Sequence, residues 1–142
     1  MSDAVMVIGG GIAGIQASLD LAKGGARVVL VERAPTIGGV MAVLDKNFPT
    51  LDCSICIEAP KMSEVGLHPN IEILSLAEVA EVRGNVGDFT VTLRQQTRYI
   101  TDACTRCGEC TIVCPVVLPN EYDSGMAFRK AIYTPIPQSV PG

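Results

Sequence analysis

The sequence predicts an α/β fold in which a parallel sheet with a glycine-rich turn is followed by a β-hairpin and a small cysteine-rich segment. Three observations lead to this prediction. An apolar run at Val5–Ile8 enters a G-x-G-x-x-G turn directly, strand-like runs at 77–83 and 89–94 flank a turn, and four cysteines gather between Cys104 and Pro115. The 142 residues have room for one domain, or for one domain with a small appendage.

Charge, hydropathy and cysteine content argue against several classes of function. The net charge of −4 argues against a nucleic-acid surface. No apolar stretch approaches the roughly 20 residues of a membrane-spanning helix. The first basic residue is Lys23, so the start lacks the basic region of a signal peptide, and we expect a cytoplasmic protein. In such a protein, the six cysteines indicate metal or redox ligands rather than a disulfide framework.

The first strand and its turn are the best-defined part of the nucleotide-binding prediction. The unbroken apolar run Val5–Ile8 predicts a central parallel strand that is buried on both faces. Gly9 would permit the turn, Gly11 would let the backbone approach a pyrophosphate, and Gly14 would let helix and strand pack closely. The alternative is a glycine-rich turn that binds no ligand.

A helix and a second strand complete a βαβ unit. The helix is predicted over 12–23 and ends at Gly24-Gly25, and its N-terminus at Ile12 and Ala13 would attract an anion. The strand is predicted over 27–31, and Glu32 closes it as the acceptor for a ribose hydroxyl. The buried stripe of the helix is predicted to hold Ile15, Leu19 and Ala22.

The residues after Glu32 favour FAD over NAD, which is the alternative. Arg33 follows the acid directly, and a Gly-Gly pair comes shortly afterwards, as in the FAD-binding half of two-dinucleotide flavoproteins. In those proteins the pair lets the chain cross close to the cofactor. The predicted cofactor-binding residues are therefore Gly9, Gly11, Ile12, Ala13, Gly14, Glu32, Arg33, Gly38 and Gly39.

The middle of the chain carries a second thiol motif. Residues 40–47 predict a short helix or a loop over the cofactor, and 58–65 predict one or two helical turns. Between them lie Cys53 and Cys56 in a C-x-x-C pattern, which suits a redox dithiol, a pair of metal ligands, or two small structural residues near the flavin. His68 is predicted to lie in a loop at the head of the next strand.

A third strand and a hairpin follow. Residues 71–74 predict a short strand parallel to the first two, and 77–83 and 89–94 predict the two arms of an antiparallel hairpin. The turn between the arms is signalled by Gly84-Asn85-Val86-Gly87-Asp88.

The segment Cys104–Pro115 has the strongest motif in the chain. Cys104, Cys107, Cys110 and Cys114 stand at x2, x2, x3 spacing with a proline after the last thiol, which is the pattern of a [4Fe-4S] site. A zinc knuckle or a pair of disulfides is the alternative, but zinc sites usually separate two cysteine pairs by a dozen or more residues.

The last 25 or so residues change in character. Their prolines and Gly125 deny regular structure to most of the segment, apart from a predicted helical turn at 126–131. We expect this segment to lie on the surface as an extended arm. The predicted organisation is a partial FAD-binding domain at 1–100, a ferredoxin-type segment at 101–120 and a Pro-rich tail at 121–142.

With these motifs placed, the chain resembles the A-type iron–sulfur flavoprotein component of CoB–CoM heterodisulfide reductase and its relatives. The resemblance covers nearly the whole chain, and its central cysteine, Pro-Lys-Met and His-Pro-Asn block is specific to that family. The matching segments are Val7–Gly14 with Gln16, 32–39, Asp52–Cys56 with Ala59–Met62, His68–Glu72, Cys104–Pro115 and Arg129–Tyr133.

The resemblance implies an electron-transfer subunit that passes electrons between FAD and [4Fe-4S] clusters. FAD would occupy the N-terminal part of a thioredoxin-reductase-like domain with an inserted ferredoxin domain. The implied partners are the other heterodisulfide-reductase-like subunits and a hydrogenase or formate dehydrogenase link, with ferredoxin as an acceptor. In methanogen enzymes of this family the flavin bifurcates electron pairs.

Two other functions remain open. One is a free-standing electron carrier with a single cluster held by all four cysteines, and the other is a non-catalytic subunit that binds a partner through its tail. In two-cluster ferredoxins the fourth cysteine of such a run ligates the other cluster. The family members are several times longer, so Cys104, Cys107 and Cys110 are the firmer ligands and Cys114 is the uncertain fourth.

Overall fold

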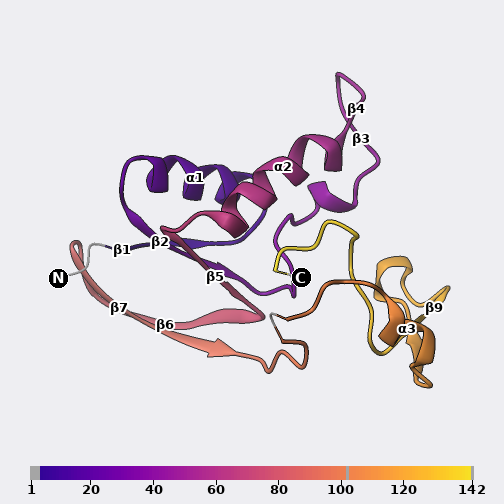
Figure 1. The fold of residues 1–142 in the computed structure, drawn as a ribbon. Coiled ribbons are helices and arrows are strands. Elements are labelled where there is room, and N and C mark those ends of the chain that lie inside the picture. Colours follow the sequence, from indigo (N-terminus) through magenta and orange to yellow (C-terminus); the bar gives the residue numbers. More distant parts are fainter. Residues whose placement is uncertain (1–3, 102, 142) are drawn as a thin grey trace.

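A three-stranded parallel sheet stands at the centre of the computed structural model, which describes residues 4–101 and 103–141. Residues 1–3, 102 and 142 fall within the predicted domain ranges but lie outside the described residues. The strands are β1 (Ala4–Ile8), β2 (Arg27–Glu32) and β5 (Ile71–Ser75), in the order β1-β2-β5. Figure 1 shows the two longer helices, α1 (Ile12–Lys23) and α2 (Ser54–Leu67), on one side of this sheet. The predicted α/β class is confirmed.

The βαβ unit forms as its local pattern predicts. Helix α1 begins at Ile12 and ends at Lys23, and its buried apolar stripe is the predicted one. Strand β1 pairs in parallel with β2, and β2 pairs in parallel with β5. The core between helices and sheet is formed by Ile15, Leu19, Leu30, Ile37, Ala42, Met62, Val65 and Ile136.

Strand β1 differs from its prediction in burial. Val5 is 39% exposed and Ile8 is 66% exposed, so the expectation of a strand buried on both faces is wrong. The reason is the position of β1 at the edge of the sheet, because among the described residues its only strand partner is β2. An unbroken apolar run predicts a strand, but burial requires neighbours on both sides.

Helix α2 is longer than the predicted turns at 58–65. Cys53 caps its start, because the Cys53 side chain accepts the backbone N–H of Cys56. Pro60 is inside the helix and cannot donate a backbone hydrogen bond, yet the helix continues to Leu67. Gly66 also lies within the helix, and His68 follows as the C-cap before β5, in the predicted loop position.

The hairpin that follows β5 matches its prediction. Strands β6 (Ala77–Asn85) and β7 (Asp88–Gln95) pair antiparallel, with an irregularity between Val79 and Glu81. In Figure 1 this hairpin lies on the side of the sheet away from α1 and α2. A second, much shorter hairpin of β3 (Lys46–Asn47) and β4 (Asp52–Cys53) follows the 3-10 turn η1 (Met41–Val43) and leads into α2.

The C-terminal third contains a short helix and a ribbon. Helix α3 (Glu109–Val113) lies within the cysteine run, and β8 (Val117–Pro119) pairs antiparallel with β9 (Phe128–Lys130) around η2 (Glu121–Asp123). The predicted helical turn at 126–131 is therefore wrong. A strand forms there because Phe128–Lys130 finds a pairing partner about ten residues earlier in the chain, which local propensity does not reveal.

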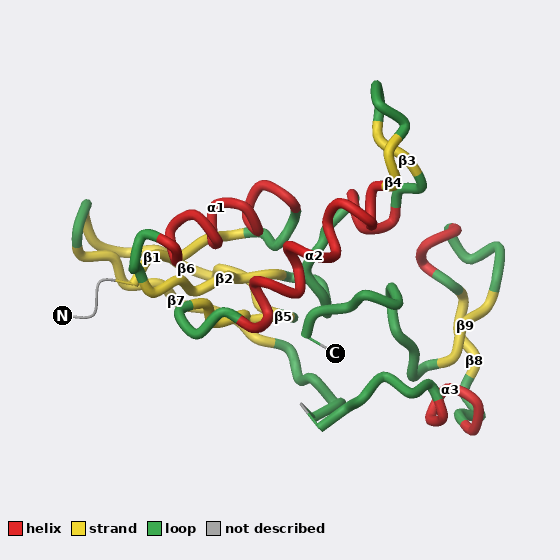
Figure 2. Tube along the Cα trace, turned by 45° about the horizontal axis from the view of Figure 1, so that its top comes forward, coloured by secondary structure: helices red, strands yellow, loops and turns green. Residues whose placement is uncertain are grey.

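The expected surface arm is also wrong for the end of the chain. Ile136 is 8% exposed and belongs to the core cluster. Ile37 donates its backbone N–H to Val140 O at 2.9 Å, and the Val140 N–H donates to Thr36 Oγ1 at 2.8 Å. We call these two hydrogen bonds the C-terminal clasp. The tube in Figure 2 shows the terminal segment returning toward the sheet and α2.

None of the helices in the described part of the chain is long and apolar enough to span a membrane.

Candidate cofactor sites

The glycine turn adopts the geometry that its sequence predicts. Gly9 has a φ of +100°, a conformation that residues with a side chain rarely adopt, and it donates its N–H to Val31 O at 2.8 Å. Gly11 is the N-cap of α1, and the first bond within the helix runs from the Ile15 N–H to Gly11 O at 2.9 Å. The N–H groups of the first turn are thus available to an anion at the positive end of the helix dipole.

Space around the glycines supports a separate role for each. A Cβ on Gly11 would meet no atom within 4 Å, so this backbone faces an open cradle. A Cβ on Gly14 would lie 1.9 Å from Gly9 O, so helix and turn pack too closely for any side chain. This arrangement fits a pyrophosphate placed against Gly11, with Gly14 holding the helix to the turn.

Glu32 supports the glycine turn through its carboxylate. It is 9% exposed, and its Oε2 accepts the Gly10 N–H at 2.6 Å while Oε1 accepts the Ala34 N–H at 2.7 Å. A carboxylate has about four acceptor positions, so two remain for the hydroxyls of a ribose. Gly10 is not one of the three glycines of the G-x-G-x-x-G pattern, so the sequence did not single it out. A Cβ at Gly10 would nevertheless lie 2.7 Å from Ile37 Cγ2, which leaves no room for a side chain.

The Gly38-Gly39 pair crosses directly beside the turn. Gly38 donates its N–H to Gly10 O at 2.7 Å and forms a parallel bridge with Gly11. Both glycines have positive φ, +118° and +59°, and a Cβ on Gly39 would lie 3.1 Å from Gly11 Cα. The structure therefore brings the second glycine motif to the first. Arg33 lies next to Glu32 with an exposed side chain.

The cysteine run is a loop followed by one short helix. The Cys104 N–H donates to Thr101 O at 3.0 Å, and the Arg106 N–H donates to Cys104 Sγ at 3.4 Å. Gly108, with a φ of +83°, is the N-cap of α3 and forms the turn that leads into it. Cys110 lies in that helix, and Cys114 is its C-cap.

All four thiols of the run are free, and their placement is uneven. Cys104 and Cys114 are partly buried, whereas Cys107 and Cys110 are exposed. Within the described residues, no three metal-ligating side chains are close enough to hold a metal ion. The loop thus carries four thiols that could ligate iron, but their side chains do not converge on one point. In such segments metal binding and folding are generally coupled, so the ligands take up their final positions when the metal binds. The ligand set stays a prediction.

Three of the four cysteines nevertheless line one cavity. Cys104, Cys110 and Cys114 line a pocket of about 640 Å³, which Cys107 does not line. The lining also includes Pro35 and Thr36, which belong to the loop between Glu32 and the Gly-Gly pair. One loop therefore borders both the nucleotide turn and the cysteine-lined pocket.

The local electrostatics favour thiolates at two of these positions. A backbone hydrogen bond with Glu109 is the main cause that lowers the pKa of the Cys107 thiol. A backbone hydrogen bond with Ile132 is the main cause that lowers the pKa of Cys114. Thiolate is the form that ligates iron, so both shifts suit a cluster-binding role.

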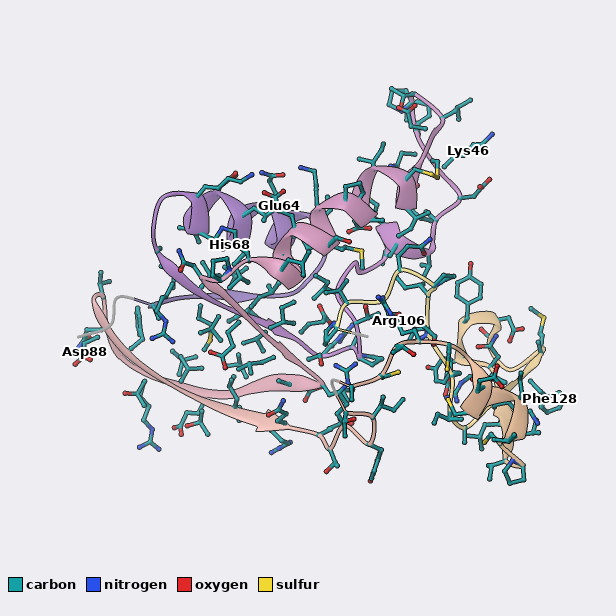
Figure 3. All side chains as sticks on the ribbon, in the orientation of Figure 1. Lys46, Glu64, His68, Asp88, Arg106 and Phe128 are labelled. Carbon is teal, nitrogen blue, oxygen red and sulfur yellow. A yellow bond between two sulfur atoms is a disulfide. The ribbon has the colours of Figure 1, made fainter. Side chains whose placement is uncertain are left out.

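The C-terminal segment holds the cysteine loop in place. Arg106 donates from its guanidinium to Ser139 O, and Lys130 Nζ donates to Cys114 O at 2.9 Å. Figure 3 labels Arg106 between the main body and the region of α3 and β9. These polar contacts were not anticipated, because the two basic residues carry no motif of their own.

The other thiol motif is not part of either arrangement. Cys53 and Cys56 are joined in a disulfide at the start of α2, which rules out both as free metal-ligating thiols in this structure and is compatible with a redox pair or a structural one. Neither residue lines the cysteine pocket. Whether the pair serves redox chemistry or structure stays a prediction.

Comparison with known proteins gives a consistent assignment. A family model described as FAD dependent oxidoreductase matches residues 4–51, and one described as 4Fe-4S binding domain matches residues 97–117. FAD and a [4Fe-4S] cluster are thus the cofactors of this chain, as the sequence predicts. Among solved structures, L-proline dehydrogenase from P. horikoshii is similar over 66% of this chain and 20% of its own, with a TM-score of 0.54 and 26% identity.

Curated relatives are similar over a larger part of the chain. The second A-type iron–sulfur component of the CoB–CoM heterodisulfide reductase of Methanopyrus kandleri is 59% identical over 99% of this chain and 22% of its own length. The A-type component of the H(2):CoB-CoM heterodisulfide,ferredoxin reductase of Methanothermobacter marburgensis is 54% identical over 99% of this chain and 22% of its own. The chain thus spans about a fifth of the length of these relatives. By sequence, it belongs to the family of A-type iron–sulfur subunits of CoB–CoM heterodisulfide reductase.

Proposed function

We propose that this chain forms the electron-transferring flavin and iron–sulfur part of a heterodisulfide-reductase-type oxidoreductase. The observation that carries the proposal is the loop from Glu32 to Gly39. Its two ends lie at the nucleotide turn, where Glu32 and Gly38 bond to Gly10, and its middle lines the cysteine pocket through Pro35 and Thr36. Both cofactor sites would therefore share one wall, which suits electron transfer between them.

Each part of the chain has a distinct task in this proposal. The N-terminal turn of α1 and the open backbone at Gly11 would hold the pyrophosphate, and Glu32 would hold the ribose. When bound, FAD supplies two-electron chemistry and the cluster supplies one-electron transfer. The polypeptide fixes the positions of the two cofactors, and this electron transfer needs no side chain that acts as acid, base or nucleophile.

Cys114 is proposed as a ligand in the same site as Cys104 and Cys110. A two-cluster ferredoxin would send the fourth cysteine to another cluster. Here Cys104, Cys110 and Cys114 line one pocket. The Lys130 Nζ group donates to Cys114 O and holds the backbone of Cys114 in place. This arrangement supports the alternative in which one run serves one cluster, with Cys107 completing the set.

The partners belong to the same proposal. Relatives are named as subunits of complexes that link H(2), formate or ferredoxin to the heterodisulfide. We therefore propose that the chain works with the other heterodisulfide-reductase-like subunits and a hydrogenase or formate dehydrogenase link, with ferredoxin as an electron acceptor. The proposal includes a cytoplasmic location, because free cluster-ligating thiols need a reducing compartment.

The cluster is tested by Cys107→Ala in anaerobically purified protein. We expect iron and acid-labile sulfide to fall strongly while the flavin absorption stays at the wild-type level. The matched control is Ile112→Ala, a substitution in the same cysteine run at a side chain that is 74% exposed. Unchanged iron in Cys107→Ala would reject the ligand assignment.

The flavin site is tested by Gly11→Val. Because a Cβ on Gly11 meets no protein atom within 4 Å, the variant should fold, but its side chain should occupy the space of the pyrophosphate. We expect loss of FAD binding with an unchanged melting temperature of the apoprotein. Ala17→Val, an equally branched substitution on the exposed face of α1, should retain FAD. Wild-type FAD affinity in Gly11→Val would contradict the nucleotide site.

A further inference from the structure

The disulfide between Cys53 and Cys56 stands apart from both cofactor sites. It lies at the start of α2, next to the short β3–β4 hairpin, and both cysteines are exposed. Figures 1 and 2 show this hairpin projecting from the body of the molecule beyond the first turn of α2. The sulfurs are therefore open to a reactant from solution.

A purely structural role explains this disulfide poorly. A disulfide stabilises a fold mainly by restricting the unfolded chain, and this effect grows with the length of the loop that it closes. Cys53 and Cys56 are only three residues apart, so their bond connects no distant segments. The first turn of α2 is already held by the buried Ser54, whose hydroxyl donates to Asn47 Oδ1 at 2.9 Å.

The two sulfurs have different surroundings, and those of Cys53 favour a negative charge. Cys53 is the N-cap of a 14-residue helix, and its Sγ accepts the Cys56 N–H at 3.3 Å. The positive end of the helix dipole and a backbone donor both stabilise a thiolate at this position. Cys56 lies one turn into the helix, where it supplies the donor.

A cation stands directly across the hairpin from Cys53. Lys46 is its partner in the antiparallel register of β3 and β4, and directly paired side chains share one face of the ribbon. The neighbouring pair, Asn47 with Asp52, points to the other face because side chains alternate along a strand. Figure 3 labels Lys46 in this projecting region.

Two backbone contacts fix this arrangement. The Leu51 N–H donates to Asn47 O at 2.7 Å, closing the hairpin, and the Ser54 N–H donates to Asp45 O at 3.3 Å. The hairpin therefore holds Lys46 and Cys53 opposite each other in its register through backbone contacts of its own.

We propose that Cys53 and Cys56 form a thiol–disulfide exchange site in which Cys53 is the attacking sulfur. Its substrate is a solvent-accessible disulfide. In the dithiol form, the Cys53 thiolate attacks one substrate sulfur, the substrate S–S bond breaks, and the other substrate sulfur leaves as a thiolate. Cys56 loses its proton to water and attacks Cys53 Sγ, which releases the second substrate thiolate and restores the Cys53–Cys56 bond. Two electrons pass to the substrate, and a second, external dithiol returns the site to its reduced form.

The order of attack is tested by trapping the mixed disulfide. Flavin- and iron-loaded protein is reduced anaerobically, the reductant is removed, and an aromatic disulfide that releases a coloured thiolate is added. In Cys56→Ser the adduct should form on Cys53 and persist, and it should form about tenfold faster than the adduct on Cys56 in Cys53→Ser. Peptide mass spectrometry separates these adducts from those on the other four cysteines. Equal or reversed rates would overturn the proposal.

The role of Lys46 is tested in the Cys56→Ser background. Lys46→Gln should slow adduct formation on Cys53 several-fold, and Lys46→Arg should restore it. Arg83→Gln, an exposed cation on the other hairpin, should leave the rate unchanged. If Lys46→Gln reacts at the wild-type rate, the cation has no part in activating Cys53, and a site built from Cys53, Cys56 and Lys46 is rejected.

The substrate class and the independence of the site are tested together. Wild-type dithiol protein should reduce oxidised glutathione, insulin disulfides or both, and the comparison distinguishes a small substrate from a protein one. Failure with both would overturn the proposal.

Iron and flavin contents of Cys53→Ser and Cys56→Ser should equal those of wild type. Loss of iron would make the pair cluster ligands and refute this inference, while leaving the function proposed above intact.

Discussion

Gly14 is the position where a single added carbon conflicts most directly with the fold. A Cβ there would lie 1.9 Å from Gly9 O, a backbone atom that cannot move without displacing the turn. We expect Gly14→Ala to lower the free energy of unfolding by about 3 kcal/mol. Urea denaturation followed by circular dichroism measures this loss.

The matched control is Gly11→Ala on the other side of the same turn. Its Cβ meets nothing within 4 Å, so its stability should stay within about 1 kcal/mol of wild type. Equal losses in the two variants would show that close packing of helix and turn is not what requires glycine at Gly14.

Glu58 is a buried acid without a partner. Its side chain is 0% exposed, and among the described residues neither carboxyl oxygen has a hydrogen-bond partner. Burial raises the pKa of the Glu58 carboxyl from 4.5 to about 7. The folded state therefore binds this proton more tightly than the unfolded state, so stability falls as pH rises through that interval.

This imbalance predicts a specific pH dependence. Between about pH 5 and about pH 8, the wild type should lose roughly 2–3 kcal/mol of unfolding free energy from this group, and Glu58→Gln should remove that part of the loss. Glu64→Gln, on the same helix at an exposed ion pair with Lys23, should keep the wild-type profile. Parallel wild-type and Glu58→Gln profiles would contradict a neutral, buried carboxyl.

At the scale of elements, the C-terminal segment has a larger structural role than its composition suggests. Ile136 lies in the core cluster, and Val140 packs against α2, where a Cβ on Gly66 would be 2.7 Å from Val140 Cγ1. The same segment contributes a wall of the cysteine pocket. It therefore couples the nucleotide-binding part of the chain to the cysteine run.

Truncating Ile136 tests that coupling. Ile136→Ala should cost about 2–3 kcal/mol of unfolding free energy, as for other buried aliphatic side chains. The substitution should also increase the rate at which a maleimide modifies Cys104 and Cys114 in the apoprotein, because their pocket loses support. Ile112→Ala, at an exposed position, should change stability by less than about 0.5 kcal/mol. An unaltered stability in Ile136→Ala would mean that the tail is only loosely attached.

Elements with local signals were predictable, and those with distant partners were not. The bounds of α1 follow from Gly11 before it and Gly24 after it, so sequence neighbours define the helix. Strand β9 forms only because Val117–Pro119 pairs with it, and α2 extends through Pro60 because Cys53 caps its start and its buried face packs on the core. Neither effect leaves a periodic pattern at the residues concerned.

For the whole molecule, the nucleotide site was more predictable than the iron–sulfur site. The roles of Gly9, Gly11 and Gly14 depend on one turn, so the residue types specify the geometry. The cysteine spacing specifies donors alone. Its surroundings depend on Arg106 and the tail, which meet through an interaction 33 residues apart in the chain. The exposure of β1 was also beyond local reasoning, because it depends on which strands lie beside it.

The C-terminal clasp has a consequence for the order in which the molecule assembles. It joins residues 104 positions apart, whereas the glycine turn is completed within about the first forty residues. The entropy of closing a loop rises with its length, and distant contacts tend to form after local ones. The nucleotide cradle can therefore form early in folding, while the cysteine pocket gains its last wall only when the clasp closes. Flavin loading can accordingly precede cluster insertion, and the clasp sets the moment at which the cysteine loop becomes enclosed.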